Sequence, residues 1–94
     1  MNKLQILLAE DNPALQNVIR FNLLSVGMEV HAVSRGDDAL KLFQNADFDC
    51  LICDHQMPGM AGMDLIRAIR QGTHNPDIPA ILCTSRVVDL DHDY

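Results

Sequence analysis

Hydrophobic and polar positions along the 94-residue chain follow two alternating periods. Residues 4–9, 50–53 and 80–83 are short apolar runs bounded by polar or turn-forming residues, and residues 29–33 form another short segment of strand type. Runs of this length are typical of strands buried on both faces of a sheet, although periodicity alone does not exclude a helix. The pattern predicts four strands.

A segment with helical spacing follows each of the first three predicted strands. In the first segment, Asn12 is an expected N-cap, Pro13 suits the first helical position, and Gly27 ends the pattern. Its apolar positions are Leu15, Val18, Ile19, Leu23 and Val26. We therefore expect an amphipathic helix between the first two strands.

Two more helices are predicted in the same way. Ser34 with Asp37 three residues later resembles a capping box, and the helix that it opens should bury Ala39, Leu40 and Phe43. The third helix follows the turn Pro58-Gly59, carries Leu65, Ile66 and Ile69 inward, and ends near Gly72. Pro79 then introduces the fourth strand.

Strands that alternate with helices require a parallel sheet with right-handed crossovers and helices on both faces. The fold class predicted is therefore α/β, a doubly wound parallel sheet that is incomplete at the C-terminus. Residues 1–94 are long enough for one domain, and no linker or low-complexity segment divides them. Residues 85–94 fit either the start of a fourth helix or a polar tail.

Composition narrows the classes of function. Thirteen acidic residues against seven basic ones give a net charge of −6, and no run of Lys or Arg could follow a phosphate backbone, which argues against direct nucleic-acid binding. No apolar run is long enough to span a membrane. The odd number of cysteines, three, fits buried thiols in a reducing compartment, so a cytoplasmic location is expected.

Acidic residues stand directly after two of the predicted strands. Glu10 and Asp11 follow the first strand, Asp54 follows the third, and Thr84 follows the fourth. Ligands of open parallel sheets bind beyond the carboxyl ends of the strands, so these residues should share one rim. The alternative is that each acid is only a helix cap or loop residue, but acids after two strands and a hydroxyl after another favour a site.

Carboxylates that converge on one rim would repel each other unless a cation lay between them. Oxygen ligands suit a hard ion, and Mg²⁺ commonly takes one or two carboxylates, a backbone carbonyl and waters. If the first and third strands are neighbours, the sequence predicts a magnesium site.

Three segments, at these strand ends, resemble the receiver domains of bacterial two-component response regulators. They are Leu7-Leu8-Ala9-Glu10-Asp11-Asn12, then Cys53-Asp54-His55-Gln56-Met57-Pro58-Gly59-Met60, and then Thr84-Ser85. Their order and context agree over essentially the whole chain, and the combination is far more specific than an acidic pair alone. The resemblance implies a CheY-like, flavodoxin-like strand order 2-1-3-4, with a fifth strand absent from this chain.

The resemblance also implies a role for each site residue. Asp54 would take a phosphoryl group from a phosphohistidine on a sensor histidine kinase or phosphotransfer protein. Asp11, Asp54 and the backbone carbonyl of Gln56 would hold Mg²⁺, with Glu10 acting through a metal-bound water. Thr84 would donate its hydroxyl to the phosphoryl group. The domain would be a switch and not an enzyme, with at most slow autodephosphorylation, and an effector domain or protein is a further expected partner.

The chain departs from the family pattern in two respects. Ala61 stands where the family usually has a helix-opening Asp, and the strand-end Lys is missing, because Lys3 and Lys41 lie elsewhere. A plain surface arginine is the favoured interpretation of Arg86 over a substitute phosphate contact. We favour truncation over a natural short form, since a bare fourth strand and an uncovered first helix predict aggregation or a swapped dimer.

Two functional alternatives stay open. A pseudo-receiver would bind partners without phosphorylation, which the missing Lys favours and the intact acids oppose. A magnesium-dependent phosphohydrolase would need a second acid two residues past the nucleophile, where this chain has Gln56. The kinase, the output and the oligomeric state cannot be predicted from the sequence.

The pair Cys50-x-x-Cys53 imitates a redox or zinc motif. Residues three apart on a strand point to opposite faces, so buried core cysteines are the favoured interpretation. Whether Cys53 and Cys83 approach each other across neighbouring strands stays open.

Overall fold

The computed structural model describes residues 3–83, in which strands and helices alternate as the sequence pattern predicts. The strands are β1 (Gln5–Ala9), β2 (Glu29–Val33), β3 (Cys50–Asp54) and β4 (Ala80–Cys83), and the helices are α1 (Pro13–Ser25), α2 (Gly36–Asn45) and α3 (Gly62–Gln71). Every expected element is present in the described part. The expectations for residues 84–94, which include Thr84, Arg86 and a fourth helix, lie outside it.

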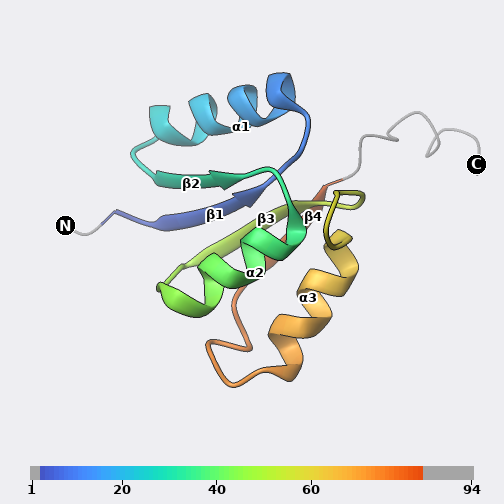
Figure 1. The fold of residues 1–94 in the computed structure, drawn as a ribbon. Coiled ribbons are helices and arrows are strands. Elements are labelled where there is room, and N and C mark those ends of the chain that lie inside the picture. Colours follow the sequence, from blue (N-terminus) through green and yellow to red (C-terminus); the bar gives the residue numbers. More distant parts are fainter. Residues whose placement is uncertain (1–2, 84–94) are drawn as a thin grey trace, which may run out of the picture.

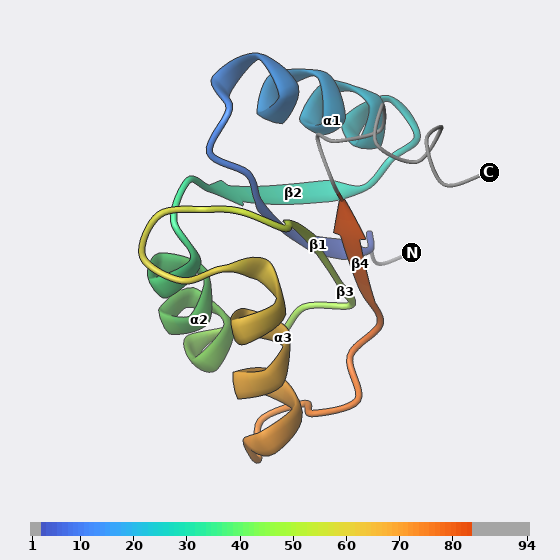
Figure 2. The same cartoon turned by 90° about the vertical axis from the view of Figure 1, so that its right-hand side faces the viewer.

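The four strands form one parallel sheet in the order β2-β1-β3-β4. Helix α1 covers one face of the sheet, and α2 and α3 lie side by side on the other (Figures 1 and 2). This arrangement confirms the predicted doubly wound fold and its strand order. It also places the carboxyl ends of all four strands at the same edge.

The hydrophobic core lies between the sheet and the pair α2 and α3. Its fully or nearly fully buried members are Leu7, Ala9, Ala39, Phe43, Phe48, Leu51, Cys53, Leu65, Ile69 and Ile78. Burying each such large side chain contributes roughly 1.5–3 kcal/mol relative to leaving it exposed. The helix face predicted at Ala39 and Phe43 and the face predicted at Leu65 and Ile69 are both in this core.

Helix α1 begins and ends where the sequence indicates. The side chain of Asn12 accepts hydrogen bonds from the backbone N–H groups of Ala14 and Leu15, at 3.0 and 3.2 Å. At the other end, Gly27 has φ +89°, and its N–H donates to the carbonyl of Leu24 at 3.0 Å. Only a glycine adopts this left-handed conformation without strain, so it closes the helix.

The predicted burial of the apolar face of α1 is only partly correct. Val18 and Val26 are 57% and 68% exposed, and Phe21 is 72% exposed. Among the described elements, the helix packs mainly against β2 and β1, so one side of it rests on the sheet while these residues are exposed. Helical spacing identifies an apolar stripe, but it does not say how wide a surface will meet that stripe.

The capping box predicted for α2 is wrong. The N-cap is Arg35, whose backbone is extended, and no side chain caps the helix. Ser34 therefore lies one residue too early; its hydroxyl instead accepts a long 3.5 Å bond from the Gln16 amide. Asp37 is held by Arg35, at 3.0 Å between Nε and Oδ1.

Helix α3 opens at Ala61, which offers no capping side chain. Its far end is tied to the following loop by Arg70, whose guanidinium donates to the carbonyls of Pro76 and Ile78 at 2.7 and 2.6 Å. These bonds hold the chain as it returns to β4. Within residues 3–83, no helix is both long and apolar enough to cross a membrane.

The missing cap on α3 gives a stability prediction. Ala61→Ser should raise the free energy of unfolding by about 1 kcal/mol, because a hydroxyl at the N-cap would accept a hydrogen bond from an unpaired N–H of the first turn. Chemical denaturation of the full chain measures it. Ala68→Ser, inside the same helix, is the control and should lower stability slightly, because Ser has a lower helix propensity than Ala. Equal effects of the two changes would contradict this account of the N-cap.

Candidate phosphoryl and metal site

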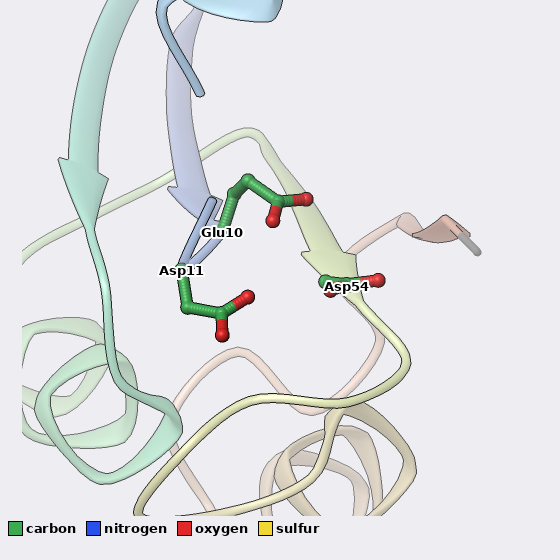
Figure 3. Close-up of side chains that lie close together, drawn as sticks. All are labelled: Glu10, Asp11 and Asp54. Atoms are coloured by element: carbon green, nitrogen blue, oxygen red, sulfur yellow. The ribbon is translucent and has the colours of Figure 1, made fainter. Parts of the chain in front are cut away.

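Three carboxylates meet at the carboxyl edge of the sheet. Strands β1 and β3 are neighbours with Ala9 opposite Cys53, so the next residues of each chain segment, Glu10 and Asp54, emerge side by side. Glu10, Asp11 and Asp54 each offer a carboxylate oxygen, and these atoms all lie within 4.8 Å of one another (Figure 3). The predicted convergence of the three acids is confirmed.

The backbone that carries Glu10 is fixed by β2 and α1. The Glu10 N–H donates to the carbonyl of Val33 at 3.0 Å. The side-chain amide of Gln16 donates to the carbonyl of Glu10 at 2.8 Å and to that of Val33 at 3.2 Å, so it joins the ends of β1 and β2. This role of Gln16 was not predicted; its only signal in the sequence is that a polar residue stands beside the apolar stripe of α1.

Glu10 is buried, and only one of its two carboxylate oxygens has a hydrogen-bond partner among the described residues. It is 1% exposed, and its Oε2 accepts a hydrogen bond from the Asn12 N–H at 3.0 Å. Oε1 is buried without a hydrogen-bond partner among the described residues. Burial raises the pKa of Glu10 above its ordinary value, and the charges of Asp54 and Asp11 act in the same direction. An unpartnered anionic oxygen facing two further carboxylates is the environment that a hard cation stabilises.

Asp54 is the last residue of β3 and is 7% exposed. Its Oδ1 accepts a hydrogen bond from the N–H of His55 at 2.8 Å, which fixes the rotation of the carboxylate. The same N–H lies 2.8 Å from the carbonyl of Cys83 on β4. Asp11 is exposed, so the cluster is closed toward the sheet and open toward solvent on the Asp11 side.

Of the other predicted site residues, Gln56 lies within the described part of the chain and Thr84 lies outside it. Gln56 is exposed in the loop two residues beyond Asp54, and the role of its carbonyl as a ligand stays a prediction. Thr84 lies outside residues 3–83. Lys41 is on the exposed side of α2 and Lys3 precedes β1 at the far edge of the sheet, so neither joins the cluster, as expected.

Of the three cysteines, Cys53 belongs to the hydrophobic core, whereas Cys50 and Cys83 are partly buried. All three are free thiols, and Cys53 is fully buried. Burial raises the pKa of Cys53 to about 12, and the pKa of Cys83 is raised by burial and then by the charges of Asp54 and Glu10. Across the β3–β4 pair, Cys53 is opposite Leu82 and Cys83 is opposite Asp54, so the two thiols leave the sheet on opposite faces.

Comparison with known proteins decides what kind of domain carries this site. The family described as "Response regulator receiver domain" matches residues 6–92. The chain belongs to this family. Receiver domains of two-component response regulators accept a phosphoryl group, and they generally bind Mg²⁺ in an acidic pocket.

Relatives of this receiver domain include a transcriptional regulatory protein and a chemotaxis protein. It is 38% identical over 82 residues to the phosphate regulon transcriptional regulatory protein PhoB of Rhizobium meliloti, covering 87% of this chain but 36% of the relative. It is 31% identical over 83 residues to the chemotaxis protein CheY of Pseudomonas aeruginosa, covering 87% and 67%. The chain thus spans about a third of the length of the transcriptional regulator.

One solved structure is informative about the acidic pocket. The receiver domain of the sensor histidine kinase PA1611 from Pseudomonas aeruginosa PAO1 was solved with a magnesium ion coordinated in its active-site cleft. It superimposes with a TM-score of 0.82 at 32% identity, covering 86% of this chain and 66% of the neighbour.

The raised pKa of Glu10 gives a pH-dependent stability prediction. Below the ordinary pKa of 4.5, Glu10 is protonated in both the folded and the unfolded chain, so it costs nothing. As the pH rises through the interval between that value and the higher folded pKa, the unfolded chain loses its proton first, and the free energy of unfolding falls. Without divalent ions, Glu10→Gln should therefore be more stable than the unmutated protein at neutral pH, by about 1 kcal/mol.

Denaturation at a series of pH values checks this prediction. The stability difference should grow as the pH rises above 4.5. Glu29→Gln makes the same chemical change at an exposed position of β2 and serves as the control for the loss of one negative charge. A stability difference for Glu10→Gln that stays constant with pH would mean that the buried charge is not its cause.

Proposed function

We propose that Asp54 is the phosphoacceptor of a signalling switch and receives its phosphoryl group from a phosphohistidine on a sensor histidine kinase or phosphotransfer protein. Asp11, Asp54 and the backbone carbonyl of Gln56 hold Mg²⁺ in this proposal, and Glu10 acts through a metal-bound water. Bound Mg²⁺ offsets the carboxylate charge and the charge on the transferred group.

The observation that carries the proposal is the buried, unpartnered Oε1 of Glu10 within the three-carboxylate cluster. A buried anion without a partner is costly, and a fold keeps such a group where a ligand will satisfy it. The donor set contains only oxygens, which favours magnesium over softer transition metals. The magnesium in the PA1611 receiver domain supports the same assignment.

The chain's own residues account for the transfer as follows. A carboxylate oxygen of Asp54 attacks phosphorus, the phosphorus–nitrogen bond of the phosphohistidine breaks, and its electron pair stays with the imidazole. The His55 N–H holds the Asp54 carboxylate in one rotation, so the nucleophile is positioned before the donor arrives. Thr84 is proposed to donate its hydroxyl to a phosphoryl oxygen of the product.

The resulting acyl phosphate is a stored state and not a released product. We therefore propose that the domain is not an enzyme and that autodephosphorylation is at most slow. Gln56 is consistent with this, because a phosphohydrolase of related topology would place a second acid at that position.

A pseudo-receiver is the second candidate. The observation that favours it is that Lys3 and Lys41 both lie away from the acidic cluster, so neither of these two side chains contacts a phosphoryl group there. The three intact carboxylates oppose it, since a module that binds partners without phosphorylation has no use for a buried unpaired anion.

Relatives suggest two settings for the switch. The transcriptional regulator PhoB supports an effector as partner, whereas the sensor histidine kinase GacS of Pseudomonas protegens, 36% identical over 87 residues, supports a place within a kinase or phosphorelay. A swapped dimer through the edge strand stays a proposal as well.

The test is incubation of the full chain with Mg²⁺ and an excess of a small acyl phosphate donor, followed by intact mass measurement. The unmutated protein should gain the mass of one phosphoryl group, and Asp54→Asn should gain none. Asp49→Asn, an exposed acid just before β3, is the matched control and should be phosphorylated normally.

The outcomes separate the candidates. An adduct that needs both Asp54 and Mg²⁺ supports the receiver function. No adduct on the unmutated protein would favour the pseudo-receiver, and rapid consumption of the donor without an adduct would indicate a hydrolase.

A further inference from the structure

The loop after the phosphoacceptor is contacted by a turn that contributes nothing to the acidic cluster. This loop, residues 55–61, runs from the end of β3 past the start of α2 before it enters α3 (Figure 2). The N–H of Gly36, the first residue of α2, donates to the carbonyl of Pro58 at 3.0 Å. The bond therefore joins the β2–α2 turn directly to the loop that carries Gln56.

Gly36 is glycine because the loop occupies the space of a side chain. It is buried, and a Cβ at this position would overlap the carbonyl oxygen of Met60 and lie 2.7 Å from its carbonyl carbon. Both are backbone atoms, so no side-chain rotation could relieve the overlap. Any larger residue at position 36 must push the loop away.

A second contact covers the turn of the loop. The Arg35 guanidinium meets the Asp37 carboxylate through two bonds, Nε to Oδ1 at 3.0 Å and Nη2 to Oδ2 at 3.1 Å. Gly59 lies against this pair: a Cβ there would overlap Asp37 Oδ1 and lie 2.9 Å from Arg35 Nη2. Gly59 has φ +82°, so its conformation already requires glycine. The half-exposed pair adds little stability as an ion pair, but it shapes a surface against which the loop rests.

The other end of the loop is held against the backbone of His55 and Asp54. The N–H of Gly62 donates to the carbonyl of His55 at 3.0 Å, and a Cβ on Gly62 would overlap the backbone carbonyl oxygen of Asp54. With this end held, a displacement at residues 58–60 cannot be absorbed at the start of α3. It is passed back along the loop toward Gln56.

We propose that Arg35, Gly36 and Asp37 are positioning residues for the phosphorylation site. By holding residues 58–60 they set where the Gln56 carbonyl lies relative to Asp54, and so they set the affinity for Mg²⁺. The inference rests on the proposed function, because it assigns these residues to the metal site described there. Coupling of this kind is reciprocal, so occupation of the site also tightens the contacts at the start of α2.

The first test compares two glycine substitutions in the full chain. Gly36→Ala should weaken Mg²⁺ binding, measured by titration calorimetry, about tenfold or more, as loss of a supporting contact to a metal ligand typically does. Gly72→Ala is the control. A Cβ at position 72 would meet its nearest atom, the carbonyl oxygen of Ala68, at 3.3 Å, and Gly72 lies at the C-terminal end of α3, away from the acidic cluster. It should leave Mg²⁺ affinity unchanged.

The second test does not depend on a buried position and so holds if Gly36→Ala fails to fold. Asp37→Asn removes the charged partner of Arg35, while Asp38→Asn removes the same charge from the next residue, also exposed. Asp37→Asn should weaken Mg²⁺ binding several-fold, and Asp38→Asn should not. Amide resonances of residues 55–57 and 59–61 should shift in the first variant only, which a general loss of stability would not produce.

The outcomes distinguish failure of this inference from failure of the proposed function. If the unmutated protein binds Mg²⁺ and Gly36→Ala and Asp37→Asn bind it equally well, the inference is overturned and the site assignment stands. If each control weakens binding as much as its partner variant, the inference is likewise wrong. If the unmutated protein binds no Mg²⁺, the proposed function fails, and the inference fails with it.

Discussion

The pairing of β1 with β3 determines where the chemistry of this domain lies. Its register sets Ala9 opposite Cys53, and one residue further the two strands release Glu10 and Asp54 toward the same volume. The directions of both side chains are fixed, because the strand sets the face on which each successive side chain lies. A slip of one residue in this pairing would turn Asp54 to the other face and dissolve the cluster.

The same pairing brings the negatively charged carboxylates of Glu10, Asp11 and Asp54 close together. Glu10 is almost completely buried beside two like charges, and one of its oxygens has no partner in the described chain. The hydrophobic core beneath, between the sheet and the helices α2 and α3, supplies the stability that lets the fold hold this arrangement. Functional sites commonly carry such local costs, and the rest of the fold compensates for them.

The strands, the ends of α1 and the acidic cluster could be predicted because they depend on local sequence. Three short apolar runs and one further segment of strand type located the strands, and Asn12 and Gly27 marked both ends of α1. The acids at the ends of β1 and β3 identified the site. Strand ends of a parallel sheet share an edge whatever the details of packing, so sequence position was sufficient.

What escaped prediction depends on contacts between distant segments. The capping pattern at Ser34 was a local signal that the extended backbone of Arg35 overrode. The exposure of Val18 was invisible because periodicity does not say what covers a helix. The fit of Gly36 against Met60 joins two loops, and no spacing within either loop announces it.

Burial and the nearby carboxylates affect the reactivity of the two thiols close to the site, those of Cys53 and Cys83. Oxidants and electrophiles react with thiolates, and in this domain burial together with the negative charges of Asp54 and Glu10 keeps Cys83 in the neutral form, while the pKa of Cys53 is about 12. The electrostatic field that attracts a cation to the carboxylates thus also suppresses the nucleophilic sulfur next to them.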